Sequence, residues 1–555
     1  MLINDTYQLF FRNEVSYSNM RWEILGKDKD IVKTLLKNRG IADSKIFFEP
    51  QEPKTIYLKD LGVSKLELTK AFKRIKQAKS KKEKVIIYGD YDADGICATA
   101  ILWEAINEYG LDVLPHIPDR FKEGYGINAT SVENLKLKIE NLKLIITVDN
   151  GIVGYEGIKK AKELGIDVIV LDHHQPHSAK ASRGRKDFNL GAYAVIHSTE
   201  VCGSALAYFF SKELGLKSGL ELATIGTIAD QMPLIGVNRS VVKYGLQDLK
   251  RTKRVGLKTL FSDSKIDEVG TYEVNYIIAP RINAMGRLAN GLDSLRLLCT
   301  KKLDKAQELS KLLTKTNTDR QKIVDGVATH ALDISKKEIN KILVLAHESY
   351  HEGVIGLAAG KLVEKFYKPS IVISIGKEKS KASARSVSGF NIIEAIKKTE
   401  LILEGGGHPM AAGFSIDTTK IEEFTEKINT VSDELLTEEM LTKKLKIDME
   451  LTFDQLNYKL VNELKQFEPI GVGNPGPTFV TRKVEVVDVK TVGKEKTHLK
   501  LKLKQGSVVL DAIGFGLAKD YSLKTNSYID IAYNLEENVW NGNTSLQLKI
   551  RDIKL

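Results

Sequence analysis

Apolar runs that end in acidic side chains recur through the first half of this chain, and they constrain its fold more than any other feature. KVIIYGDYDADG, KLIITVDNG and DVIVLDHH are strand-like, and LATIGTIAD repeats the pattern. Helix-like stretches such as GICATAILWEAINEYG and VGYEGIKKAKELG separate the runs. The alternation predicts an α/β fold with a mostly parallel sheet and right-handed crossovers. The carboxyl ends of the strands would open onto one crevice, where sheets of this kind bind ligands.

The side chains at the ends of these runs form the candidate site. Its members are Asp90, Asp92, Asp94, Asp149, Asp172, His173, His174 and Asp230. Carboxylates that are packed together without cations raise one another's pKa, and divalent ions remove that repulsion. Oxygen ligands with a few imidazoles suit manganese, magnesium or zinc. We therefore predict a two-metal hydrolytic site.

Acids in these positions have two other common roles. A single acid after a strand is more often a helix N-cap or a turn residue than a metal ligand. The Asp-x-Asp-x-Asp-Gly segment also resembles a calcium loop, but an EF-hand needs a glutamate at its twelfth position and flanking helices. Four acid-ended runs in one region, with His173 beside His174, favour the metal centre. Two ions about 3.5–4 Å apart can activate water, so no serine or cysteine nucleophile is required.

The remaining sequence predicts further regions. Residues 1–70 carry no motif, and the pattern from 256 to 338 is helical, with a long helix within LDKAQELSKLLTKTNTDRQKIVDGVATHAL. Residues 339–440 read as a second α/β unit, in which a Gly-rich loop at 405–408 follows a helix. After about residue 446, five alternating segments predict a small β-barrel of the OB type. Lys500, Lys502 and Lys504 share one face of a strand there, either as nucleic-acid contacts or as a solvated outer face.

Composition fits a multidomain protein with a polyanionic partner. The 555 residues exceed what one hydrophobic core supports, and 83 Lys and Arg against 72 Asp and Glu give a net charge of +11. No apolar run approaches ~20 residues and the first residues lack a signal-peptide pattern, so we expect no membrane association. Three dispersed cysteines favour buried thiols in a reducing cytoplasm. Because no GxGxxG or P-loop follows a strand, a nucleotide-cofactor site is not supported.

The motifs also resemble a known family. GDYDADG, VDNG, LDHH and GTIADQMPL, in this order, resemble the DHH phosphoesterase superfamily, whose name corresponds to Asp172-His173-His174. DRFKEGYGIN, PRINAMGR, HEGVIGLAAGKL, SARSVSG, GGGHPMAAG and FEPIGVGNPGP make the chain similar to the RecJ-type single-stranded-DNA exonucleases of that superfamily. One segment departs from the family, which usually has a Pro-containing loop and an Asn-Pro where this chain reads QPHSAKASRGRKDFNLGAYAVIHSTEVC.

The resemblance implies a division into domains. Residues 71–255 would form a parallel-sheet DHH metal-binding catalytic domain, and 256–338 would be a helical linker. Residues 339–440 would form a second α/β, DHH-associated domain that binds substrate, and 446–555 would form a nucleic-acid-binding OB-type β-barrel.

The resemblance also implies metal ligands. Asp149 would bridge two ions and take part in catalysis. Asp92 would bind one ion, and a set of Asp94, His173 and Asp230 would bind the other.

The resemblance gives the other polar residues of the site several different roles. Asp90 and Asp172 are each either a ligand or a partner that orients one. His174 would face the scissile phosphate as a catalytic residue. Substrate contacts are expected from a further set: Arg120, Arg281, Asn283, Arg385, Ser386, Gly406, Gly407 and His408. Arginine offers bidentate donors to phosphate, and backbone N–H groups of a Gly-rich segment can approach it closely.

Taken as a member of that family, the chain would be a 5′-to-3′ exonuclease that degrades single-stranded DNA to mononucleotides in DNA repair and recombination. Its cofactors would be two manganese or magnesium ions, and its partners a single-strand-binding protein and a helicase in the cytoplasm. The alternative is a DHH phosphodiesterase acting on nanoRNA or cyclic dinucleotides, which would lack the helical segment and the barrel. A binding scaffold without activity would have lost the site acids, and this chain keeps them.

Overall fold

The chain folds into two compact units. The structure, a computed structural model, describes all residues except 1–19, 176–189, 216–218, 336–339 and 541. The N-terminal unit comprises residues 43–318 and 467–475, and the C-terminal unit comprises the described parts of 1–42, 319–466 and 476–555. Residues 176–189, within the segment that departs from the family pattern, lie outside the described residues.

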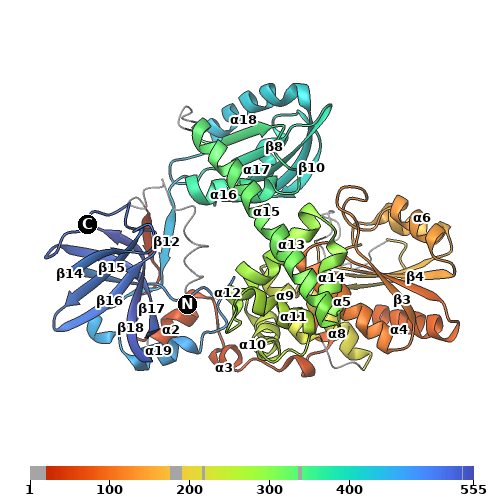
Figure 1. The fold of residues 1–555 in the computed structure, drawn as a ribbon, viewed down its shortest axis with the longest axis horizontal. Helices are drawn as coiled ribbons and strands as arrows, with labels where there is room; N and C mark the ends of the chain where they lie inside the picture. The colour runs from red at the N-terminus through yellow and green to blue at the C-terminus, as the bar shows by residue number, and fades with distance from the viewer. Residues whose placement is uncertain (1–19, 176–189, 216–218, 336–339, 541) are drawn as a thin grey trace. The chain divides into compact units, whose positions relative to one another are not determined.

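A five-stranded sheet forms the centre of the N-terminal unit (Figure 1). Its strands are β2 (Lys84–Tyr88), β3 (Asp112–His116), β4 (Leu142–Val148), β5 (Asp167–Asp172) and β6 (Ala194–His197). They lie in the order β3-β2-β4-β5-β6, and every neighbouring pair is parallel. The predicted parallel α/β fold is therefore confirmed.

Helices cover both faces of this sheet, and this explains why the strands read as continuous apolar runs. Val85 and Ile87 of β2 belong to one core with the helices α5 (Ala93–Glu108) and α8 (Gly203–Glu213). Ile86 and Tyr88, which point the other way, belong to a second core with α6 (Ala129–Lys138) and α7 (Tyr155–Glu163). The strand order reverses between β2 and β4, and the predicted acids follow β2, β4 and β5, at the position where such sheets bind ligands.

The fourth acid-ended run is a helix, so the strand prediction for it is wrong. LATIGTIAD lies in α9 (Leu220–Ala229), and Asp230 caps its C-terminal end. Residues 222–228 of this helix are all buried, and a buried helix and a buried strand both appear as unbroken apolar sequence. Strand–helix alternation ends at β6, because α8, α9 and α10 (Gly236–Lys250) follow one another.

The helical region that was predicted after residue 256 is present. It contains α11 (Val255–Asp263), α12 (Thr271–Glu273), a π-helix (Val274–Ile278), α13 (Ala279–Leu288), α14 (Gly291–Cys299) and the 33-residue α15 (Leu303–Ser335). The boundary between the units falls within α15, after Thr318. Ahead of the first sheet lie β1 (Arg21–Ile24), α2 (Ile31–Asn38), α3 (Ser44–Phe48), two 3₁₀ turns (Pro53–Thr55, Leu58–Leu61) and α4 (Lys65–Ser80).

The C-terminal unit contains the predicted second α/β sheet. Its strands are β7 (Leu343–His347), β8 (Ser370–Ser374), β9 (Lys379–Arg385), β10 (Ile402–His408) and β11 (Ala411–Asp417), in the order β10-β11-β9-β8-β7. The helices are α16 (Ile355–Phe366), α17 (Ile392–Lys397) and α18 (Ile421–Leu435), and a 3₁₀ turn (Thr418–Lys420) precedes α18.

The Gly-rich segment is not the predicted loop, because it forms the end of the edge strand β10. Gly406 lies opposite Gly413 in the antiparallel pairing with β11. A Cβ on Gly405 would lie 2.7 Å from Cβ of Phe414, so the glycine permits close pairing of the two strands. The glycines allow β10 and β11 to pair closely. From sequence alone, glycines with this role look the same as glycines in a turn.

A closed barrel completes the C-terminal unit. β14 (Phe479–Val492), β15 (His498–Gln505), β16 (Val508–Gly514), β18 (Asn543–Lys554) and β17 (Tyr528–Trp540) pair in this order, and β17 pairs back with β14. Five strands with this closure confirm the OB-type prediction. Shorter elements precede the barrel: β12 (Lys444–Ile447), which pairs with β1, β13 (Met449–Glu450), a 3₁₀ turn (Phe453–Gln455) and α19 (Tyr458–Lys465). No helix in the described part of the chain is long and apolar enough to cross a membrane.

Candidate metal centre

The loop between β2 and α5 carries Asp90 and Asp92, and the first turn of α5 carries Asp94. Asp92 is the N-cap of α5, and its Oδ1 accepts a hydrogen bond of 3.0 Å from the Gly95 N–H. The Asn283 side chain, on α13, accepts a hydrogen bond of 2.7 Å from the Ala93 N–H. The loop is therefore fixed from both sides.

The N-terminus of α8 contacts two of the acids. The Gly203 and Ser204 N–H groups donate to the Asp94 carboxylate at 2.7 and 3.0 Å. The partial positive charge of a helix N-terminus stabilises a carboxylate in this position. A Cβ on Gly203 would lie 2.6 Å from Cβ of Asp149, so only glycine lets the helix approach so closely. Asp149 itself has φ +60°, a left-handed backbone that aspartate and asparagine tolerate better than most residues.

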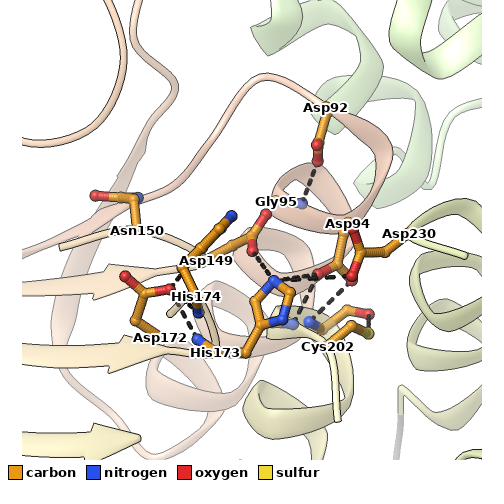
Figure 2. A network of polar contacts seen from close by, with 12 residues as sticks. Asp92, Asp94, Gly95, Asp149, Asn150, Asp172, His173, His174, Cys202 and Asp230 are labelled. Atoms are coloured by element: carbon orange, nitrogen blue, oxygen red, sulfur yellow. Dashed lines mark hydrogen bonds and ion pairs between the residues drawn. The ribbon is translucent and has the colours of Figure 1, made fainter. Parts of the chain in front are cut away.

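His173 lies among three carboxylates (Figure 2). Its Nε2 is 3.0 Å from Asp149 Oδ1, 3.8 Å from Asp230 Oδ2 and 4.0 Å from Asp94 Oδ2. Three sets of side chains have ligand atoms within 4.8 Å of one another: Asp90, Asp92 and Asp149; Asp94, His173 and Asp230; and Asp149, His173 and His174. Residues from four separate sequence motifs thus meet at one point, as the alternating pattern predicted.

The carboxylate of Asp172 is occupied by hydrogen bonds from neighbouring groups. Its buried carboxylate accepts from the N–H groups of Ile152 at 2.8 Å, His173 at 2.7 Å and His174 at 3.1 Å. The same carboxylate lies 2.8 Å from His174 Nδ1. Of the two roles left open for Asp172, this arrangement favours the partner that orients a neighbour.

Comparison with known proteins gives the family. The DHH family N-terminal domain matches residues 84–229, the DHHA1 domain matches 339–433 and the RecJ OB domain matches 447–552. The single-stranded-DNA-specific exonuclease RecJ of Bacillus subtilis is 34% identical over 96% of this chain and 71% of its own length. The chain belongs to the RecJ family.

Other RecJ relatives agree with this assignment. RecJ of Haemophilus influenzae is 32% identical over 85% of this chain and 88% of its own length. The crystal structure of Thermus thermophilus RecJ in complex with Mn²⁺ has a TM-score of 0.80 at 27% identity, covering 97% of this chain and 80% of that one.

Charge crowding in this RecJ-family site shifts several pKa values. Burial, followed by the neighbouring Asp94, raises the pKa of Asp149, and burial together with Asp94 and Asp92 raises that of Asp230 to about 8. Burial, with the charge of Asp92, raises the pKa of Asp90. Burial lowers the pKa of the His174 imidazole, but its hydrogen bond to Asp172 outweighs burial and raises that pKa to about 9. The carboxylates outnumber the one cationic imidazole, His174, so bound cations would relieve the remaining repulsion.

Unpaired oxygen atoms point to the same need. Asp90 Oδ1 and Asp149 Oδ1 are buried and accept no hydrogen bond from any described residue. His173 Nε2 reaches 3.0 Å from the latter atom, which is an ion-pair distance, but without the alignment of a hydrogen bond. Burying a carboxylate oxygen costs free energy unless a hydrogen-bond donor or a cation contacts it. The site therefore fits hard divalent cations, which carboxylates and imidazoles bind together.

Three predicted substrate residues lie in the N-terminal unit. The Arg120 guanidinium is 5.2 Å from the centre of the Tyr91 ring, which belongs to the acid loop. Arg281 is buried on α13, where its Nη1 donates to the carbonyl of Ile277 at 2.7 Å. Asn283 holds the acid loop through Ala93, a structural contact that the motif alone did not reveal.

The other predicted substrate residues meet on the second sheet. Ala411 pairs with His408 on one side and with Arg385 on the other, so β10, β11 and β9 bring these ends together. Arg385 Nη1 donates to the carbonyl of Ala384 at 2.8 Å and to Ser383 Oγ at 3.2 Å. Ser386 is buried and donates to the carbonyl of Phe390 at 2.7 Å, so its hydroxyl is used within the fold. Gly406 and Gly407 are the exposed residues just before His408.

Sequence reasoning missed several groups at the centre. The Tyr125 hydroxyl lies 3.4 Å from His174 Nε2 and 3.5 Å from the Asp149 carbonyl oxygen. The buried Asn150 amide donates to the carbonyls of Tyr88 and Val148 at 3.2 and 2.9 Å. Tyr125 and Asn150 stand inside the quoted motifs DRFKEGYGIN and VDNG, so the signal was present but unassigned.

Proposed function

We propose that this protein is a metal-dependent exonuclease that degrades single-stranded DNA from the 5′ end to 5′-mononucleotides. The convergence of five acids and two histidines from separate motifs, in a chain of the RecJ family, is the observation that carries the proposal. On the same basis we propose a role in DNA repair and recombination, in the cytoplasm, with a single-strand-binding protein and a helicase as partners.

The proposed cofactors are two manganese or magnesium ions. Asp149 occurs in two of the three ligand groups, which supports its role as the shared ligand. Asp90 and Asp92 would complete one position, and the set of Asp94, His173 and Asp230 the other. When bound, the ions neutralise phosphoryl oxygens and lower the pKa of the attacking water.

The side chains of this chain supply positioning and a proton source. Asp172 accepts from Nδ1 of His174, so Nε2 of the same ring is directed toward the Tyr125 hydroxyl. With a pKa of about 9, the imidazole holds a proton at neutral pH and can donate a hydrogen bond to a phosphate oxygen. Asp172, which is fully buried, keeps the ring in that orientation.

We also propose the predicted regions as domains, with one amendment. The limits remain 1–70, 71–255, 256–338, 339–440 and 446–555. Residues 467–475, which fall inside the last of these, belong with the metal-binding unit.

The central test uses a single-stranded oligonucleotide labelled at its 5′ or its 3′ end and digested with manganese or magnesium. We expect the 5′ label to be released as a mononucleotide from the start of the reaction, while the 3′-labelled strand shortens gradually. RNA and cyclic dinucleotides serve as competing substrates. Preferential hydrolysis of cyclic dinucleotides or short RNA would replace this proposal by that of a small-substrate phosphodiesterase.

A second test concerns recognition of the 5′ end. Arg385 and His408 lie on either side of Ala411 in the second sheet. A charge-assisted contact to phosphate is worth about 1.5–3 kcal/mol. Arg385→Ala should therefore raise KM for a 5′-phosphorylated strand by roughly 10- to 150-fold with little change in kcat. A strand with a 5′-hydroxyl is the control and should lose less. Equal losses on both strands would remove Arg385 as the end sensor.

A further inference from the structure

Two segments far apart in sequence meet on helix α10 of the N-terminal unit. The first, residues 47–51, follows the point where the chain leaves the C-terminal unit after Ala42. The second is the loop Phe467–Pro475, where the chain leaves the C-terminal unit for only nine residues and then returns to it. The motif FEPIGVGNPGP lies at this second crossing, and the proposed catalytic chemistry does not use it.

Arg239 of α10 joins the two segments. It is fully buried, its Nε donates to the Phe47 carbonyl at 2.7 Å, and its guanidinium carbon lies 3.9 Å from the centre of the Phe47 ring. The other end of the guanidinium donates to the carbonyls of Phe467 at 3.0 Å and Glu468 at 2.8 Å. A guanidinium is costly to bury, so a set of carbonyl acceptors drawn from both segments is a specific arrangement.

The rest of α10 strengthens the hold on the first segment. Three of its side chains donate to backbone carbonyls of this segment: Ser240 to Gln51, Lys243 to Phe48 and Tyr244 to Pro50. The ring of Phe467 also packs against both rings of the first segment, with centroids 5.7 Å from Phe47 and 5.2 Å from Phe48.

The loop Phe467–Pro475 has its own internal support. Gly471 and Asn474 exchange backbone hydrogen bonds of 2.9 and 3.1 Å, which close a tight turn. The Asn474 amide donates to the carbonyls of Phe467 at 2.6 Å and Pro469 at 2.9 Å. The Leu234 N–H donates to the carbonyl of Val472 at 2.7 Å, so the turn rests on the segment that follows Asp230.

We propose that Arg239 and its two bound segments form an anchor that keeps the chain segment between the metal-binding unit and the barrel short. The barrel strand β14 begins at Phe479, four positions after the anchored Pro475, so the tether is short while the anchor holds. A short tether raises the effective concentration of a strand bound on one part of a chain at a site on the other. Resting on the proposed function, the anchor makes Arg239 a positioning residue for long single-stranded DNA.

The test compares Arg239→Met and Arg239→Lys with Arg254→Met in the full chain. Arg254 is a mostly buried arginine of the same unit that pairs with Glu104 and Glu221, so it controls for general loss of stability. Substrates are a dinucleotide and a strand longer than the ~16 nucleotides that one OB fold spans.

Loosening the anchor should raise KM for the long strand by ~10-fold or more, with kcat and dinucleotide hydrolysis within about twofold of wild type. Arg254→Met should change both substrates by the same factor. Equal factors for the Arg239 variants, or an unchanged KM for the long strand, would overturn the proposal.

Hydrogen exchange gives a readout that needs no nuclease activity. In Arg239→Met, amide exchange should rise together in residues 47–51 and 467–475, whereas Arg254→Met should leave both segments protected. A rise in one segment alone would disprove a shared anchor, even if no single-stranded DNA is hydrolysed by the wild type. If the Arg239 variants do not fold, Tyr244→Phe and Asn474→Ala each loosen one segment and should raise KM for the long strand in the same direction.

Discussion

At the scale of single residues, Asp149 combines a strained backbone with a shared carboxylate. Asparagine tolerates the same left-handed conformation but carries no charge, so Asp149→Asn removes the ligand while it keeps the backbone. We expect metal affinity and turnover to fall together by well over ~100-fold, the upper range for a residue that only orients a ligand. Calorimetric titration with Mn²⁺ and steady-state kinetics would measure both. Activity within tenfold of wild type would exclude Asp149 as the bridge.

Protonation of Asp230 predicts a pH dependence. Its pKa rises from 3.8 to about 8 on folding without metal, so the folded state binds more protons than the unfolded state in that interval. The sign follows: this group lowers the stability of the metal-free protein as the pH rises from about 4 to about 8. Metal binding must displace the proton, so the gain in Tm on adding Mn²⁺ should increase over the same range. In Asp230→Asn this pH-dependent part should disappear, and its persistence would assign it to other carboxyls.

The convergence of the candidate ligands could be predicted from sequence because each stands at the end of a recognisable run. Tyr125 and Gly203 could not, since their importance depends on distances across the fold. No local sequence pattern indicates that the Tyr125 hydroxyl will lie beside His174. Nor does one indicate that the missing Cβ of Gly203 leaves space for Asp149. Sequence gives residue types and spacing, whereas these contacts arise only when separate elements pack.

At the scale of elements, the approach of α8 to the acids predicts a sensitive glycine. Gly203→Ala would place Cβ 2.6–2.8 Å from three atoms of Asp149, so either the helix or the acid must move. Overpacking of this kind costs about 1–3 kcal/mol, and we expect metal affinity to fall at least ~10-fold in protein that remains folded. Gly326→Ala is the matched control, because a Cβ there meets open space within helix α15. Similar metal affinity in the two variants would contradict the proposed role of α8.

The elements that were mispredicted share one cause. The apolar run of α9 and the glycines of β10 each carry a local signal that two structures can satisfy. Packing on all sides decides for a helix in the first case, and close pairing with β11 decides for a strand in the second. The parallel sheet, the long α15 and the barrel were predictable because their patterns extend over many residues and have fewer alternatives.

At the scale of the whole molecule, the lysine stripe on β15 predicts a contribution to DNA affinity. Lys500, Lys502 and Lys504 are exposed and alternate with buried leucines, although Glu485 lies 3.8 Å from the last of them. Replacing all three by alanine should weaken binding of a long strand and reduce the salt dependence by about 0.7 per lost phosphate contact. Fluorescence anisotropy at several salt concentrations would measure this.

A matched triple variant separates specific contact from net charge. Lys65, Lys73 and Lys76 are exposed on α4 in the other unit, and their replacement changes the charge equally. If both triple variants lose the same affinity, the stripe on β15 is only a solvated face.

The N-terminal unit is discontinuous in sequence. It therefore cannot finish folding as soon as its first part has left the ribosome. Its first part ends at Thr318, and its last nine residues emerge only after the second sheet and α19 have been synthesised. At ribosomal rates of ~5–20 residues per second, the unit waits on the order of 10–30 s for that loop. During this interval Arg239 and Phe47 lack their partners in the loop Phe467–Pro475. The nascent chain therefore exposes these two side chains, to which chaperones or other segments of the chain can bind.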